Sequence, residues 1–130
     1  MAMIHVMVVE DNPLVREYIV RAISDEPGFK VVAAAESASD AMFHCQRLQI
    51  DIVLMDIHSR YGSDGLSVAR EMKEKLRNVP IVMMTGMPTI GLIEEAKEIG
   101  VESFIPKDMP IVKVVEVLKS SLEGKHNYPY

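Results

Sequence analysis

The run Ile52-Val53-Leu54-Met55-Asp56 decides the fold, because consecutive apolar residues end there in a single acid. A continuous apolar run without polar alternation is typical of a parallel strand that is buried on both faces. Such a strand would carry the Asp56 carboxylate to its C-terminal end. We therefore expect the rest of the chain to surround Asp56.

The segments on either side of this run alternate between two patterns. Apolar, mostly β-branched runs predict strands, and apolar residues at helical spacing predict a helix after each strand. Short connections between alternating strands and helices indicate a parallel sheet with right-handed crossovers. The predicted strands are 4–9, 29–35, 52–56, 80–84 and 101–105, and the predicted helices begin after Asn12, after Ser37 or Ser39, at Leu66, near Pro88 and near Met109.

This pattern predicts an α/β protein with one doubly wound (βα)5 domain of the flavodoxin-like class. Its parallel five-stranded sheet is expected in the order 2-1-3-4-5, which is common for this class. The domain covers residues 1–123, and residues 124–130 are expected to be a tail or the start of a linker. The polar, glycine-containing stretch 58–65 is expected to be a loop.

Composition narrows the class of protein. The chain has 130 residues, of which 48% are hydrophobic and 25% charged, as in ordinary soluble domains. Its net charge of -5 would repel a phosphate backbone, so we expect no direct binding of nucleic acid by this domain. The apolar runs are shorter than the roughly 18 residues of a membrane span, and no secretion signal is visible, which predicts a cytoplasmic protein without membrane contact.

Cys45 is the only cysteine, so an intramolecular disulfide is impossible. Its position on the inward face of a predicted helix favours a small core residue over a redox centre.

Charged and hydroxyl residues follow several of the predicted strands. Ligands bind open parallel sheets beyond the carboxyl ends of the strands, where the strand order reverses. That rule would bring together Glu10, Asp11, Asp56, Thr85 and Lys107. The alternative for each residue alone is that it caps a helix or forms a surface ion pair.

Three carboxylates, one hydroxyl and one ammonium group in one place favour a particular kind of chemistry. Clustered carboxylates repel one another unless a cation neutralises them, and hard oxygen ligands suit Mg²⁺. An aspartate can then act as a nucleophile toward phosphorus. Lys107 and Thr85 could stabilise charge on the transferred phosphoryl group. These side chains are therefore suited to the transfer of a phosphoryl group to a carboxylate.

At this point the chain resembles the receiver domains of two-component response regulators. The resemblance extends from Ile4 to about Leu122 and, taken over all of its motifs together, is highly specific. Its motifs are Glu10-Asp11, Val53-Leu54-Met55-Asp56, Asp64-Gly65-Leu66, Met84-Thr85-Gly86 and Phe104-Ile105-Pro106-Lys107.

The resemblance implies a role for each matching residue. Asp56 would accept a phosphoryl group from the phosphohistidine of a sensor histidine kinase. Mg²⁺ would be held by Asp11 and Asp56, by Glu10 through water, and by the backbone carbonyl of His58. Thr85 and Lys107 would contact the phosphoryl oxygens. Such domains catalyse their own phosphorylation and dephosphorylation without being conventional enzymes.

Phe104 occupies the position of the aromatic switch residue of the family. In that family the ring turns inward as the hydroxyl corresponding to Thr85 moves toward the phosphate. The plainer interpretation is a core or surface aromatic on the last strand. If Phe104 is the switch residue, phosphorylation would alter a partner surface or a homodimer surface.

The segment around Pro27-Gly28-Phe29 and the pair Lys107-Asp108 resemble receivers of the LuxR/NarL type. These receivers control transcription through a C-terminal helix-turn-helix domain. Either the 130-residue chain is part of such a regulator or it is a stand-alone receiver.

Departures from the family pattern lie directly after Asp56. The loop has no proline, and Asp64-Gly65 fall one residue later than usual. The family pattern therefore does not predict the backbone path near His58. Gly86 replaces a more frequent alanine. This loop also motivates an alternative function, a receiver-like dimerisation module that acts without phosphorylation. A phosphatase of the haloacid dehalogenase type is disfavoured, because it expects a second Asp where this chain has His58.

Overall fold

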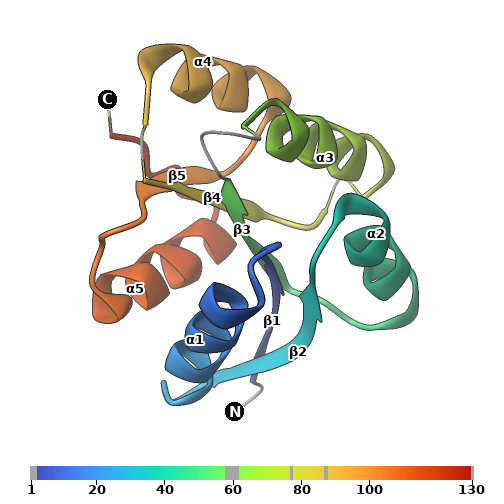
Figure 1. The fold of residues 1–130 in the computed structure, drawn as a ribbon. Helices are drawn as coiled ribbons and strands as arrows, with labels where there is room; N and C mark the ends of the chain where they lie inside the picture. The colour runs from blue at the N-terminus through green and yellow to red at the C-terminus, as the bar shows by residue number, and fades with distance from the viewer. Residues whose placement is uncertain (1–2, 58–61, 77, 87, 130) are drawn as a thin grey trace.

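The computed structural model describes residues 3–57, 62–76, 78–86 and 88–129. Strands and helices alternate through these residues (Figure 1). All strand pairs are parallel, and the sheet order is β2-β1-β3-β4-β5, which confirms the predicted topology. The strands are β1 (Ile4–Val9), β2 (Phe29–Ala35), β3 (Ile52–Ile57), β4 (Ile81–Thr85) and β5 (Ser103–Pro106), and the helices are α1 (Pro13–Ser24), α2 (Ala38–Arg47), α3 (Gly62–Lys75), α4 (Ile90–Ile99) and α5 (Ile111–Leu122).

The sheet is covered by helices on both faces. Figure 1 shows α1 and α5 on one side and α2, α3 and α4 on the other. Side chains of β3 alternate between the two layers, so Leu54 packs with α1 and α5 whereas Met55 packs with α2, α3 and α4. This burial explains why the strands are continuous apolar runs.

Local signals set the ends of the helices. The Asn12 side chain accepts hydrogen bonds from the backbone N–H groups of Leu14 and Val15 at 2.9 and 3.2 Å, and so caps α1. Of the two serines proposed to cap α2, Ser37 does so, accepting from Asp40 N at 3.2 Å. Gly100 ends α4 with φ of 94°, a conformation that favours glycine.

The prediction that 58–65 is a loop is wrong for residues 62–65, which form the first turn of α3. Residues 58–61 lie outside the described residues. The glycines and polar residues favoured a loop, but Leu66, Ala69 and Met72 anchor α3 against the sheet. An anchored helix extends cooperatively, because each added residue gains a hydrogen bond.

Two boundaries near the C-terminus are also shifted. β5 begins at Ser103 instead of Val101, and Pro106, predicted to be in the following turn, is its last residue. α5 begins at Ile111, two residues after the predicted start at Met109. Pro110 precedes this helix and marks its start, as proline lacks the N–H that the helix interior requires.

Cys45 is partly buried and packs against the core on the α2, α3 and α4 side of the sheet, as predicted. Burial raises the pKa of its thiol above the usual value. The thiolate, which is the reactive form, is therefore disfavoured at this position.

Candidate phosphoryl-acceptor site

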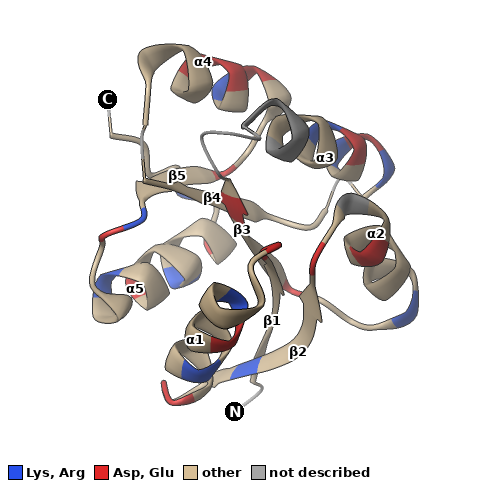
Figure 2. Cartoon of the chain, viewed as in Figure 1, with Lys and Arg blue, Asp and Glu red and all other residues tan. Residues whose placement is uncertain are grey.

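The carboxyl ends of β1, β3 and β5 bring three predicted site residues together. Asp56 is the penultimate residue of β3, Glu10 directly follows β1, and Lys107 directly follows β5. Figure 2 shows the acidic segments after β1 and within β3, and the basic segment after β5. The reversal of strand order places β1 beside β3, so the two acids meet as the sequence predicts.

Lys107 forms the closest charged contact of the site. Its Nζ lies 2.6 Å from Oδ2 of Asp56 and 3.7 Å from Oε1 of Glu10. Both acids are buried, with exposed fractions of 8% for Asp56 and 1% for Glu10. Two buried carboxylates close together are costly unless a positive charge lies near, and the ammonium of Lys107 provides one.

Thr85 and Phe104 lie on the other face of the sheet. Thr85 is opposite Ile57 of β3 and Pro106 of β5, and Phe104 is opposite Met83 of β4. Residues paired in this way share a face, so Thr85 and Phe104 belong to the side covered by α4. Both are buried, Thr85 at 0% and Phe104 at 1% exposure.

The orientation of Phe104 is inward, where it joins the core that includes Ile57 and Ile93. The sequence allowed two interpretations of this ring, a switch residue or a core or surface aromatic, and the structure places the ring in the core. A core position is compatible with the inward orientation expected of a switch residue.

Asp11 lies directly after Glu10 and is exposed. His58, the other predicted metal ligand, lies outside the described residues. Within the part of the chain that the structure describes, no group of three His, Cys, Asp or Glu side chains is arranged to hold a metal ion. Lys107 instead contacts the two buried acids.

The donor set nevertheless fits a hard divalent cation. Oδ1 of Asp56 is buried and accepts no hydrogen bond from the described residues. A buried carboxylate oxygen in this state is suited to bind a cation, and carboxylate oxygens are the ligands that Mg²⁺ prefers. Asp11, which is exposed and directly follows Glu10, is a further carboxylate in the loop after β1.

Arg16 of α1 belongs to the surroundings of the site, although the sequence analysis did not select it. Its guanidinium Nη1 donates to the backbone carbonyl of Glu10 at 2.9 Å and so ties the start of the acidic loop to α1. Arg16 follows Glu10 by six residues in the sequence, and this interval covers the loop after β1 and the first turn of α1. The contact arises because the chain bends between β1 and α1, and the sequence pattern does not show that bend.

The fold and site together define a class of protein. Residues 6–119 match the family described as the response regulator receiver domain. The chain belongs to this family, as the resemblance predicted, and its structural neighbours include response regulators of the LuxR family.

Particular relatives agree with this assignment. The chain is 32% identical to the response regulator UvrY of Escherichia coli over 123 residues, which cover 95% of this chain and 56% of UvrY. It is 31% identical to the transcriptional regulatory protein LnrK of Bacillus subtilis over 122 residues, covering 94% and 55%. The chain thus spans a little over half the length of these relatives.

Solved structures share the fold. A two-component response regulator of the LuxR family from Aurantimonas sp. superposes with a TM-score of 0.87 at 27% identity, covering 97% of this chain and 89% of that one. The receiver domain of the NarL regulator from Mycobacterium tuberculosis gives 0.86 at 24% identity, covering 96% and 100%. At that identity the second comparison supports the fold alone.

Within the described residues, none of the helices combines the length and the apolar character needed to cross a bilayer.

Proposed function

We propose that this receiver is a phosphorylation-dependent switch in which Asp56 accepts a phosphoryl group from a sensor histidine kinase. The observation that carries the proposal is the buried Asp56 carboxylate, 8% exposed, with Lys107 Nζ at 2.6 Å. An ion pair buried at a strand end is costly to maintain for stability alone. Its position at the reversal of strand order is where parallel sheets carry ligand sites.

The transfer step follows from the chemistry of a carboxylate nucleophile. An oxygen of Asp56 attacks the phosphorus of a phosphohistidine, an oxygen–phosphorus bond forms, and the nitrogen–phosphorus bond breaks with its electron pair returning to the imidazole. Lys107 contacts an oxygen of the acceptor and is placed to stabilise negative charge on the incoming group. Thr85 is the hydroxyl expected to bind the phosphoryl oxygens afterwards.

Mg²⁺ fits the carboxylates of this site. Asp11 and Asp56 would hold it, with Glu10 acting through water and the His58 carbonyl as a further ligand. A bound divalent cation would neutralise part of the charge on the phosphoryl oxygens. Lys107 would then be released from balancing both buried acids and would be available to the phosphoryl group.

The output of the switch would pass through the residues between Thr85 and Lys107. Thr85 and Phe104 share a face of the sheet, and Phe104 belongs to the core cluster that also includes Ile93 and Ala96 of α4. A shift of the Thr85 hydroxyl toward a phosphate would change the packing beneath α4 and β5. We propose that this surface controls a partner or a homodimer, and through it transcription, by a DNA-binding domain such as LuxR/NarL regulators carry.

Intact mass spectrometry tests the acceptor directly. The chain is incubated with Mg²⁺ and acetyl phosphate, and we expect a gain of one phosphoryl group. Asp56→Asn should abolish the gain, because the amide is not a nucleophile of this kind. Asp108→Asn is the matched control, because Asp108 is exposed, lies beside Lys107 and should leave the gain intact. A gain that survives Asp56→Asn would refute the assignment.

A further inference from the structure

The outer edge of β5 is covered by the C-terminal residues of the chain. β5 ends the sheet order of the described strands, and an edge strand presents unpaired main-chain groups. The backbone N–H of Phe104 donates to the carbonyl of Asn127 at 2.8 Å, and Ser103 and Asn127 form an isolated parallel bridge. In Figure 1 the C-terminus lies beside β5. Asn127 thus pairs with β5 through one bridge at this edge.

Asn127 also bonds to a buried cluster of serine hydroxyls. Ser103 Oγ accepts from the backbone N–H and the Nδ2 of Asn127 at 3.1 and 3.2 Å, and Nδ2 donates to Ser120 Oγ at 2.8 Å. Ser103 and Ser121 are buried at 0% and 2% exposure, and their hydroxyls lie 2.7 Å apart. Buried hydroxyls require partners, so β5 and α5 present a preformed polar site for an amide side chain.

Tyr128 fills the apolar part of the same edge. Its ring stacks on Phe104 with the centroids 6.5 Å apart and an interplanar angle of 23°, and its hydroxyl donates to the Val101 carbonyl. Lys97 of α4 places Nζ 5.0 Å from the ring centroid, within range of a cation–π contact. Burial, and secondly the charge of Glu102, raise the pKa of Tyr128 to about 12.

The turn after α5 directs the segment toward the β5 of its own chain. Gly124 has φ of 89°, the left-handed conformation that favours glycine. Lys125 N donates to the Ser120 carbonyl at 3.0 Å and Gly124 N to the Ser121 carbonyl at 3.1 Å, the pattern that commonly ends helices at a glycine. This fixed turn favours the chain's own segment over that of a second copy.

We propose that the edge of β5, between α4 and α5, is a binding site for an extended peptide with an Asn-Tyr pair, occupied here by residues 125–129 as a dissociable intramolecular ligand. Main-chain pairing provides affinity and side-chain pockets provide specificity, as in other cases of strand addition. The contacts of residues 125–129 lie at the outer edge of the sheet, so the segment can leave β5 without unfolding the strands inside the sheet. The segment therefore controls access to the β5 edge, and this control can be tested without phosphorylation of Asp56.

A peptide added in trans tests the proposal. The probe is a fluorescein-labelled peptide of residues 123–130, titrated against a chain that ends at Gly124, with fluorescence anisotropy as the readout. We expect saturable binding, and binding at least about tenfold weaker to the intact chain, whose site is filled. Asn127→Ala or Tyr128→Ala in the peptide should weaken binding about tenfold through lost hydrogen bonds. His126→Ala is the matched control, because His126 is exposed.

Absence of binding to the shortened chain, with its fold verified by circular dichroism, would overturn the proposal. Equal binding by the intact chain would do the same. Dimers of the shortened chain in light scattering, unaffected by the peptide, would assign the edge to a second copy instead.

A second measurement uses the intact chain, which avoids dependence on the folding of the shortened one. Asn127→Ala should speed hydrogen exchange at the Phe104 amide and lower the pKa of Tyr128 toward its ordinary value in a tyrosinate absorbance titration. His126→Ala should change neither quantity. Unchanged exchange and an unchanged pKa in Asn127→Ala would refute the docking of the segment.

Discussion

At the scale of single residues, the contact between Lys107 and Asp56 has the greatest functional weight. The Lys107 ammonium, 2.6 Å from the acceptor and 3.7 Å from Glu10, places a positive charge beside two buried acids. A second, partly buried lysine contact lies away from this site. Lys73 donates to Glu102 and to the Val79 carbonyl, and so joins the end of α3 to the strands at the opposite end of the sheet.

Lys107→Ala should lower the free energy of unfolding by about 1–3 kcal/mol when Mg²⁺ is absent. The substitution leaves Asp56 and Glu10 without their ammonium, although the 31% exposure of the Lys107 side chain moderates the loss. Urea denaturation measures the effect. Lys113→Ala is the control, because this exposed lysine pairs with Glu116 on the surface of α5 and should change stability by less than about 0.5 kcal/mol.

Mg²⁺ should offset part of the loss in Lys107→Ala, because a divalent cation would neutralise the same carboxylates. Equal stabilities of Lys107→Ala and Lys113→Ala in metal-free buffer would show that Lys107 does not balance the buried charge.

At the scale of elements, α4 combines a well-defined end with a weak beginning. Gly100 closes the helix in the left-handed conformation, and Thr89 caps its start by accepting from Leu92 N at 3.2 Å. Gly91 lies in its first turn and lowers the helix propensity there.

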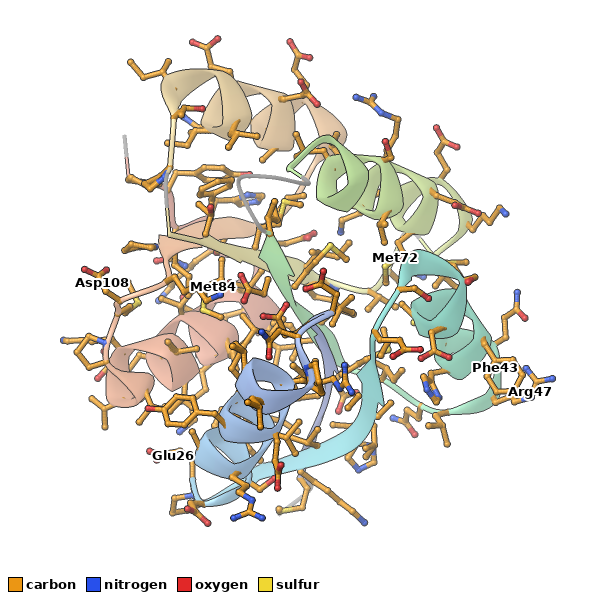
Figure 3. The ribbon with its side chains drawn as sticks, in the orientation of Figure 1. Glu26, Phe43, Arg47, Met72, Met84 and Asp108 are labelled. Atoms are coloured by element: carbon orange, nitrogen blue, oxygen red, sulfur yellow. The ribbon has the colours of Figure 1, made fainter. Side chains whose placement is uncertain are left out.

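α2 carries an exposed aromatic residue. Figure 3 shows Phe43 and Arg47 together on this helix, with the guanidinium 3.7 Å from the ring centroid.

Two glycine substitutions in α4 should have opposite effects on stability. Gly100→Ala should destabilise by about 1–2 kcal/mol, because alanine is strained at φ of 94°. Gly91→Ala should stabilise by about 0.5–1 kcal/mol through a lower entropy of the unfolded chain. A Cβ at either position meets no atom of the surrounding residues within 4 Å, so neither effect comes from a clash with another part of the structure. Thermal or urea unfolding gives both values, and effects of the same sign would contradict this account of the helix.

At the scale of the whole molecule, the sheet separates the acceptor from the expected switch. Asp56 shares the face of Leu54 with α1 and α5, whereas Thr85 and Phe104 face α4. A change at Asp56 must therefore reach α4 through the strand ends. Met84, the β4 residue opposite Asp56, is buried, and Figure 3 shows it farther inside the molecule than Asp108, which lies near the edge.

Phosphorylation should alter hydrogen exchange mainly in residues 86–109. The proposed switch repacks Phe104 beneath α4, and the exchange of amides in α4 and β5 should respond. β2 is the internal control, because it lies at the opposite edge of the sheet from β5. The measurement compares the free chain with the chain phosphorylated by acetyl phosphate and Mg²⁺. An identical pattern at residues 86–109 would refute the proposed route of the signal.

Local structure could be predicted from the sequence wherever a short pattern of residues determines it. The apolar run 52–56, the Asn12 cap and the Gly100 stop each depend on residues within one turn or strand. The sheet order followed from the alternation of strands and helices, and with it the meeting of Glu10, Asp56 and Lys107. Those features depend on hydrophobic periodicity and on topology rules, both of which a sequence displays.

Features that depend on distant contacts were decided only by the tertiary structure. Residues 62–65 became helical because the following turns are anchored to the sheet, and Lys107 proved to bridge two buried acids. The segment 125–129 lacks any periodic pattern, yet it docks on β5, because Ser103, Phe104 and α5 present partners that exist only once the sheet has formed. Periodicity reports which face of an element is buried, whereas the contacts of an aperiodic segment depend on the surface that the folded elements build.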